Sequence, residues 1–229
     1  MLRLYTWKYG AITFGLNQRL EKAVNHSVLG NTPLIRRITG GRALYHDPSE
    51  LTYAIAVNVE NLKNDNFGVS VSRAAKSIAI AIAAFLENLG VTSDYIRQSS
   101  KREARSDYFH TAPCFDSMAR YELISGGHKV VASSQRRIGT AMLQHGAIKL
   151  SGVAVHPALD GKTTEIESLP ILTAEHFTSL VTTFAAKVGD ALDLSIDFPQ
   201  LTVFQEQAIS HRYEYVRKYA LNRREIIKQ

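Results

Sequence analysis

The segment from Val71 to Gly90, which reads VSRAAKSIAIAIAAFLENLG, places the strongest constraint on the fold. Its apolar residues are nearly continuous, Ser70 can cap its start and Gly90 can end it, so it predicts a long, mostly buried helix. The runs before it alternate apolar and polar residues between turn residues, which predicts strands: LRLYTW, AITFG, PLIRRITGG and LTYAIAVNV. A buried helix after a set of strands indicates an α+β or mixed α/β fold.

The later segments continue this pattern. Strand-like alternation returns in YELISGGHKVVASSQRR and AMLQHGAIKLSGVAV, and Gly126 and Gly127 fit a hairpin turn. A helix is expected after Thr173, and the basic, aromatic segment 203–229 predicts a closing helix. The apolar face of the helix after Thr173 contains Phe177, Leu180, Val181, Phe184 and Val188. With 229 residues and 45% hydrophobic content, we expect one large domain over 1–229.

Composition narrows the class of protein. The longest strongly apolar stretch, Ile78 to Leu86, is far shorter than the roughly 20 residues of a membrane span. The first residues lack the pattern of a secretion signal, and a single cysteine forms no internal disulfide, so we expect a cytoplasmic protein. The net charge is +6, and the basic stretches also contain glutamates, as a solvated helix face does. The positive charge also suits acidic partners. The short apolar stretch argues against a membrane partner. A nucleic-acid partner is not expected either, because no stacking-aromatic or groove-helix motif is present.

The run from Arg36 to Asp47, RRITGGRALYHD, is the first candidate site. Two adjacent glycines after a strand can bring backbone N–H groups close to an anionic or acyl ligand, while the arginines supply charge. A tight turn between strands explains the same glycines equally well. His46 and His145 occur in motif-like runs, but no pair of histidines has the local spacing of a zinc site, so no metal is expected.

Cys114 and Lys129 are the second and third candidates. Cys114 lies in a loop-like segment, HTAPCFDS, where it fits either a nucleophile activated by nearby cations or a small buried hydrophobe. Lys129 begins an apolar strand, where burying an ammonium is costly. It either reaches water at the edge of the sheet or faces a substrate and stabilises an oxyanion.

Two of these runs resemble the signatures of one known family. RRITGGRALYHDPSELTYAI is similar to RRxxGGxAxxHDxxxLTYS, and GGHKVVASSQRRIGTAMLQHGAI is similar to GxKVxGSAQxRxxxxxLQHGxI, both from the lipoate/octanoate attachment (biotin/lipoate A/B protein ligase) family. The resemblance runs from about Leu4 to the final helices. It implies a largely antiparallel sheet flanked by helices, as in biotin ligases and class II aminoacyl-tRNA synthetases. Biotin ligation itself is disfavoured, because the GRGRxGR-like loop of those enzymes is missing.

Arg42 and Cys114 point to one branch of the family. ATP-dependent lipoate ligases usually carry a third glycine where Arg42 stands, whereas cysteine-dependent octanoyltransferases resemble GGRA followed by CFDxPSWYEL; this chain has GGRA and CFDSMARYEL. The resemblance implies that octanoyl passes from acyl carrier protein to Cys114 as a thioester. It then passes to a lysine of a lipoyl domain of 2-oxoacid dehydrogenases or of the glycine-cleavage H protein, and no cofactor is needed.

The resemblance also implies the site residues. Catalysis is assigned to Cys114 and Lys129, and substrate binding to the conserved-motif positions of the two signatures: Arg37, Gly40, Gly41, Arg42, His46, Ser133, Gln135, His145 and Gly146. Departures from the branch pattern concern the shape of the pocket, because Ala132 and Ser134 replace the Gly and Ala of GSAQ.

Two other functions stay open at this point. One is an ATP-dependent lipoate–protein ligase that uses Mg-ATP, for which the two signatures would suffice. The other is a non-catalytic relative that binds a lipoyl domain. The non-catalytic function is suggested by the start of the sequence. Family members usually have a further strand and helix before the segment that resembles LYTWKYGAITFG, and this sequence begins close to that segment. The chain also ends without room for the accessory domain of many ligases.

Overall fold

The computed structural model describes residues 1–61, 71–95, 122–150, 156–159 and 174–192. The chain divides into two compact units, Met1–Ser195 and Ile196–Gln229, and every described residue belongs to the first. The expected closing helix at 203–229 therefore lies outside the described residues. The expectation of one domain over 1–229 stays a prediction.

The larger sheet has six strands in the order β1-β5-β9-β8-β7-β6, and all neighbouring strands are antiparallel. Its strands are β1 (Leu2–Tyr5), β5 (Glu50–Asn58), β6 (Asp94–Tyr95), β7 (Leu123–Ser125), β8 (His128–Ile138) and β9 (Ala141–Lys149). The turn between β7 and β8 contains Gly126 and Gly127 with φ of 56° and 80°, values that favour glycine. The hairpin predicted at these glycines is confirmed.

A smaller, three-stranded sheet has the order β3-β2-β4. Strand β2 (Ala11–Phe14) pairs in parallel with β3 (Leu34–Arg36) and antiparallel with β4 (Leu44–His46). The sequence did not predict β4, because its three residues follow the two glycines closely and give too short a pattern to indicate a strand.

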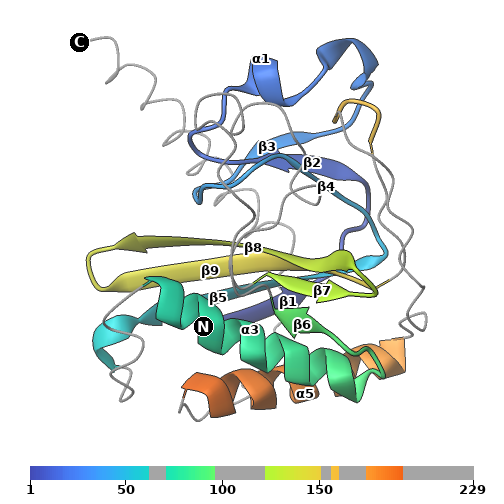
Figure 1. Ribbon diagram of the computed structural model, residues 1–229. Helices are drawn as coiled ribbons and strands as arrows, with labels where there is room; N and C mark the ends of the chain where they lie inside the picture. The colour runs from blue at the N-terminus through green and yellow to red at the C-terminus, as the bar shows by residue number, and fades with distance from the viewer. Residues whose placement is uncertain (62–70, 96–121, 151–155, 160–173, 193–229) are drawn as a thin grey trace. The chain divides into compact units, whose positions relative to one another are not determined.

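Two long helices, α3 (Val71–Asn88) and α5 (Ala174–Leu192), cover one face of the six-stranded sheet (Figure 1). They confirm the helices expected from Ser70 and from Thr173. Phe85 of α3 contacts Phe184 of α5 edge to face, with ring centroids 5.2 Å apart, and Tyr53 of β5 lies 5.7 Å from Phe184. These three rings join both helices to the sheet in an apolar core.

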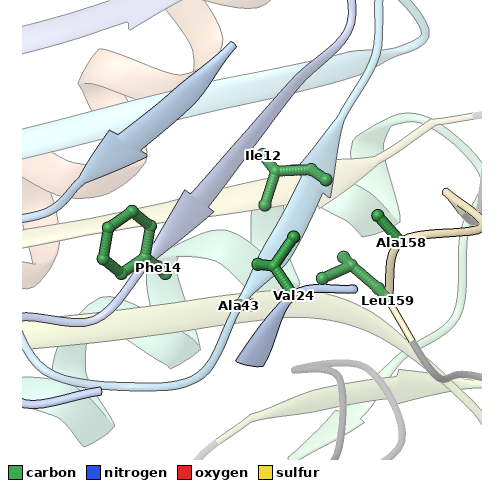
Figure 2. Close-up of a cluster of buried hydrophobic side chains, with 6 residues drawn as sticks. All are labelled: Ile12, Phe14, Val24, Ala43, Ala158 and Leu159. Carbon is green, nitrogen blue, oxygen red and sulfur yellow. The ribbon is translucent and has the colours of Figure 1, made fainter. Parts of the chain in front are cut away.

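A second apolar cluster lies on the small sheet, where it packs with the short helix α1 (Leu20–Ala23) (Figure 2). Short 3₁₀ turns at His26–Val28 and Val59–Asn61 complete the described elements. The buried members of the cluster are Ile12, Phe14, Val24, Ala43, Ala158 and Leu159. The cluster packs the small sheet, α1 and residues 158–159 against one another.

The small sheet faces the side of the large sheet opposite the helices (Figure 1). Leu44 of β4 packs against Ala132 of β8 and Ala147 of β9, so the two sheets share a small buried contact. The architecture is a largely antiparallel α+β fold with helices on one face, as predicted. The space between the two sheets is where most of the predicted site residues meet.

Candidate functional site

A pocket of about 220 Å³ opens between the two sheets. Its lining includes many of the residues predicted to bind substrate: Arg37, Gly41, His46, Ser133, His145 and Gly146. The rest of the lining is mostly apolar or carries hydroxyl groups, and consists of Tyr5, Trp7, Thr13, Ile35, Leu44, Thr52, Ala132, Ser134 and Ala147. The pocket can therefore enclose an apolar chain and offer polar groups to its end.

Arg37 holds the turn at Gly40 and Gly41, the glycine turn, against the pocket. Its guanidinium donates to the carbonyl oxygens of Gly40 and Arg42 at 3.2 and 2.6 Å, and to Thr13 Oγ1 at 2.8 Å. Gly41 has a φ of 92°, and a Cβ there would lie 3.1 Å from Arg37 Nη2. The two alternatives for the glycines are thus compatible, because the tight turn itself forms part of the pocket wall.

Side-chain hydrogen bonds join the turn to the large sheet. Thr39 Oγ1 lies 2.6 Å from His145 Nε2, and Ser134 Oγ donates to the Gly40 carbonyl at 2.9 Å. Arg136 donates to the Ile38 carbonyl at 2.7 Å. Burial, followed by the positive charge of Arg37, lowers the pKa of His145 to about 4, so this imidazole is neutral at neutral pH.

Gly146 brings β9 close to its neighbours. A Cβ at this position would lie 2.5 Å from the Ala132 carbonyl oxygen and 2.7 Å from Tyr53 Cε1. Tyr53 in turn lies 2.7 Å from Ser133 Oγ through its hydroxyl group. A side chain at position 146, which lines the pocket, would therefore displace the backbone of β8 or the ring of Tyr53.

His46 is held by contacts on three sides. Its Nε2 lies 2.7 Å from Thr13 Oγ1, its Nδ1 lies 2.5 Å from Glu50 Oε1, and Trp7 stacks on its ring with centroids 4.3 Å apart. Burial lowers the pKa of His46 and outweighs the hydrogen bond to Glu50, which acts in the opposite direction. His46 is therefore neutral at neutral pH and fixed in orientation.

Glu50 belongs to a buried charge cluster with Lys149 and Asp47. Lys149 Nζ lies 2.6 Å from Glu50 Oε2 and 3.1 Å from Asp47 Oδ2. Burial opposes the ionisation of Glu50, but its hydrogen bond with His46 and the charge of Lys149 outweigh burial and lower its pKa. The carboxylate of Glu50 is thus ionised although its side chain is fully buried.

Lys129 lies away from the lining of this pocket. Its Nζ lies 2.6 Å from Glu122 Oε1, and the exposed fractions of the two side chains are 1% and 8%. The alternative in which Lys129 reaches water at the edge of the sheet is therefore wrong. The alternative in which it faces a substrate stays a prediction.

A second cavity of about 110 Å³ lies between the large sheet and α3, and Glu122 lines it. Gln135 also lines this cavity and donates to Gln144 Oε1 at 2.8 Å. Ser133 and Ser134 line both cavities. The structure thus places Gln135 with Glu122, on the helix side of the sheet.

The remaining predicted site residues have different outcomes. Gly40 contributes its carbonyl oxygen to the turn, and Arg42 is buried there without lining the pocket. Cys114 lies outside the described residues.

Among the residues that the structure describes, no three His, Cys, Asp or Glu side chains are grouped to hold a metal ion. No helix within the described ranges is long and apolar enough to cross a membrane.

The sequence did not single out Thr13, Trp7, Glu50, Lys149 or Glu122. A threonine or tryptophan in an alternating strand carries no signal of its own. Lys149 did carry one, because it lies between Ile148 and Leu150 in an apolar strand, the same feature that drew attention to Lys129.

Residues 1–163 match the model of a protein family described as the lipoyl protein ligase A/B catalytic domain. The chain is 39% identical over 156 residues to octanoyltransferase LipM of Moorella thermoacetica, an alignment that covers 66% of this chain and 53% of that protein. It is 36% identical over 152 residues to octanoyltransferase LipM of Brevibacillus brevis, covering 65% and 54%. The chain thus spans about half the length of these two relatives. Against octanoyltransferase LipM of Clostridioides difficile, the identity is 27% over 241 residues, covering 97% and 86%.

Solved structures agree on the fold. A lipoate protein ligase from Thermoplasma acidophilum with bound lipoic acid superimposes with a TM-score of 0.63 at 14% identity, covering 93% of this chain and 81% of that one. The crystal structure of a lipoate-protein ligase A bound with ATP gives a TM-score of 0.64 at 15% identity, with the same coverage. The predicted fold is confirmed.

Proposed function

The chain belongs to the lipoyl protein ligase A/B catalytic domain family, and we propose that it is an octanoyltransferase. In this proposal the donor is octanoyl-acyl carrier protein, the acyl group is held on Cys114, and the acceptor is a lysine of a lipoyl domain or of the glycine-cleavage H protein. Relatives named octanoyltransferase support the assignment.

The observation that carries the proposal is the pocket between the two sheets. Its apolar walls, which include Ile35, Leu44 and Ala147, suit a medium acyl chain. Arg37 and His145 lie at its polar side, where a carbonyl group would meet hydrogen-bonding partners. Residues of both signatures line this pocket, which supports the proposal that it binds the acyl group.

The first step is thioester exchange. The Cys114 thiolate attacks the donor carbonyl, a new carbon–sulfur bond forms, and the carbon–sulfur bond to the carrier breaks, releasing the carrier thiolate. Because one thioester replaces another, the step needs no input of energy and no ATP. It does need a cation or hydrogen-bond donor for the oxyanion of the tetrahedral intermediate.

The resemblance to the family leads us to assign the oxyanion to Lys129, which does not line the pocket between the two sheets. Lys129 Nζ lies 2.6 Å from a carboxylate oxygen of Glu122, and the lysine side chain is almost completely buried. A buried cation is more effective than an exposed one, because the surrounding dielectric constant is low.

The second step forms an amide. A neutral lysine amine of the acceptor attacks the acyl carbon, the bond to Cys114 Sγ breaks, and the amine loses one proton. The net charge of +6 favours the approach of acidic carrier and lipoyl domains. No metal or cofactor takes part in either step.

Intact-mass analysis tests this function. The purified protein is incubated with octanoyl-acyl carrier protein, and we expect an adduct that hydroxylamine removes and that Cys114→Ala does not form. Addition of a lipoyl domain should then discharge the adduct and octanoylate the domain. Lys129→Met should slow adduct formation by roughly a hundredfold or more, whereas Lys76→Met, at an exposed position of α3, should not.

The same assay separates the other two functions. Modification of the lipoyl domain only when lipoate and Mg-ATP are supplied, with no Cys114 adduct, would identify an ATP-dependent ligase instead. Binding of the lipoyl domain without modification under either condition would identify a non-catalytic relative.

A further inference from the structure

Three side chains from three strands form an ordered series in the pocket. Thr13 of β2 is joined through its Oγ1 to His46 Nε2 of β4 at 2.7 Å, and His46 Nδ1 is joined to Glu50 Oε1 of β5 at 2.5 Å. Hydroxyl, imidazole and carboxylate groups in this order form the arrangement that activates a hydroxyl oxygen in acyl-transfer enzymes. Thr13 and His46 both line the pocket.

The direction of each proton follows from the charges. Glu50 is ionised and can only accept, so the neutral His46 carries its proton on Nδ1 and donates it to Glu50. Nε2 then has no proton and accepts from the Thr13 hydroxyl group. Arg37 Nη1 donates to Thr13 Oγ1 at 2.8 Å, which is consistent with this direction. The Nε2 lone pair of His46 thus already accepts the hydrogen bond of the Thr13 hydroxyl group and is in place to take its proton.

The carboxylate at the far end of the series is held firmly. Lys149 Nζ donates to Glu50 Oε2 at 2.6 Å, and Thr52 Oγ1 donates to Glu50 Oε1 at 2.8 Å. Trp7 donates to Thr52 Oγ1 at 2.8 Å while its ring stacks on His46. Glu50 can therefore stabilise an imidazolium on His46 without moving.

We propose that Thr13, His46 and Glu50 form a proton relay that takes up the proton released when the acceptor lysine attacks the acyl group. This inference rests on the proposed function. The amine nitrogen forms a bond to the acyl carbon and passes a proton to Thr13 Oγ1, while the Thr13 proton moves to His46 Nε2. The carbon–sulfur bond breaks, the thiolate leaves, and the imidazolium returns its proton to the thiolate or to water. Thr13 is the catalytic residue that contacts the amine, and Glu50 is a positioning residue.

The relay serves the second step alone, because thioester exchange starts from a thiolate and releases a thiolate. A purely structural role for the same hydrogen bonds would affect both steps together. The two half-reactions therefore separate the relay from a structural network.

The experiment measures the two half-reactions separately in single turnovers. Octanoyl adduct formation is followed by intact mass, and then discharge of the adduct to a lipoyl domain is followed. We expect Thr13→Val, which keeps the shape of the side chain, to leave adduct formation within about twofold and to slow discharge by roughly a hundredfold or more. Thr13→Ser restores the hydroxyl group and should restore discharge to within about tenfold of the wild type.

Thr32→Val is the matched control. Thr32 Oγ1 lies 2.9 Å from His156 Nε2, so this variant removes a comparable threonine–histidine contact that is not part of the pocket lining. Both half-reactions should be unchanged in it. If Thr13→Val does not fold, His46→Gln carries the same test, with the same selective loss of discharge.

The pH dependence gives an independent readout. The charged and titratable groups around His46 are Glu50, Lys149, Asp47, Arg37 and His145. The discharge defect of Thr13→Val should shrink as the pH rises, because hydroxide in the solvent can then take up the proton that the amine releases when it attacks. Equal slowing of both half-reactions, or a defect that does not depend on pH, would overturn the relay while leaving the transferase function intact. The absence of any wild-type adduct would overturn both.

Discussion

Lys149 Nζ lies 2.6 Å from Glu50 Oε2, and the side chains of both residues are completely buried. The pair joins β9 to the start of β5. Asp47 adds a second carboxylate, whose Oδ2 lies 3.1 Å from Lys149 Nζ. One cation therefore compensates two carboxylates beside the pocket.

Lys149→Met is expected to lower the free energy of unfolding by about 3–5 kcal/mol, because it leaves Glu50 and Asp47 without their cation. Urea unfolding followed by circular dichroism measures the change. Lys76→Met, at an exposed position of α3, should stay within about 0.5 kcal/mol of the wild type. A loss below about 1 kcal/mol for Lys149→Met would contradict the buried pair.

Stability should fall as the pH is lowered from about 6.5 to about 4. The folded protein lowers the pKa of His145 from 6.5 to about 4, so in this range the unfolded chain binds a proton that the folded chain does not. The free energy of unfolding lost through this one group over the whole range is at most roughly 3 kcal/mol. His145→Gln should show a smaller loss between pH 7 and pH 5 in urea unfolding. His26→Gln, at an exposed position, should keep the wild-type slope.

Gly146→Ala should destabilise the fold by about 1–3 kcal/mol. Its Cβ would lie 2.5 Å from the Ala132 carbonyl oxygen, which belongs to the neighbouring strand and has little freedom to move. Gly40→Ala is the matched variant, because a Cβ at Gly40 would have no other atom within 4 Å. Thermal unfolding of the two variants measures the difference, and equal melting temperatures would refute the close approach.

Leu44→Ala should change the preferred length of the acyl chain. Leu44 packs against Ala132 and Ala147 in the pocket wall, and its truncation makes room for additional methylene groups. We expect the ratio of kcat/KM for decanoyl over octanoyl donors to rise about tenfold. Ile80→Ala, at an exposed position of α3, should leave the ratio unchanged. A ratio that stays constant in Leu44→Ala would place the acyl chain elsewhere.

Most of the fold could be predicted from the sequence, because the local periodicity of apolar residues indicates where strands and helices form. The alternation of LTYAIAVNV and the apolar run of α3 are local patterns, and both elements formed where expected. Strand β4 was missed because three residues beside two glycines give too little pattern. The parallel pairing of β2 with β3 was also beyond local reasoning, since it depends on the path of the chain between them.

The site was predictable where a motif names its residues and unpredictable where a contact joins distant ones. His46 and His145 were singled out by their motifs, and both line the pocket. Thr13 has no signal in the sequence, because its importance comes only from the atoms of His46 and Arg37 around it. The pairing of Glu50 with Lys149 likewise depends on the register of β5 and β9.

That register has a consequence for the order of folding. Glu50 and Lys149 are 99 residues apart, so their contact requires the closure of a long loop before any favourable energy is gained. The glycine turn and the hairpin at Gly126 and Gly127 are local and can form early. The wall of the pocket that holds His46 is completed only when the ends of this loop meet, and a chain becomes competent to bind its substrate at one of the last steps of its folding.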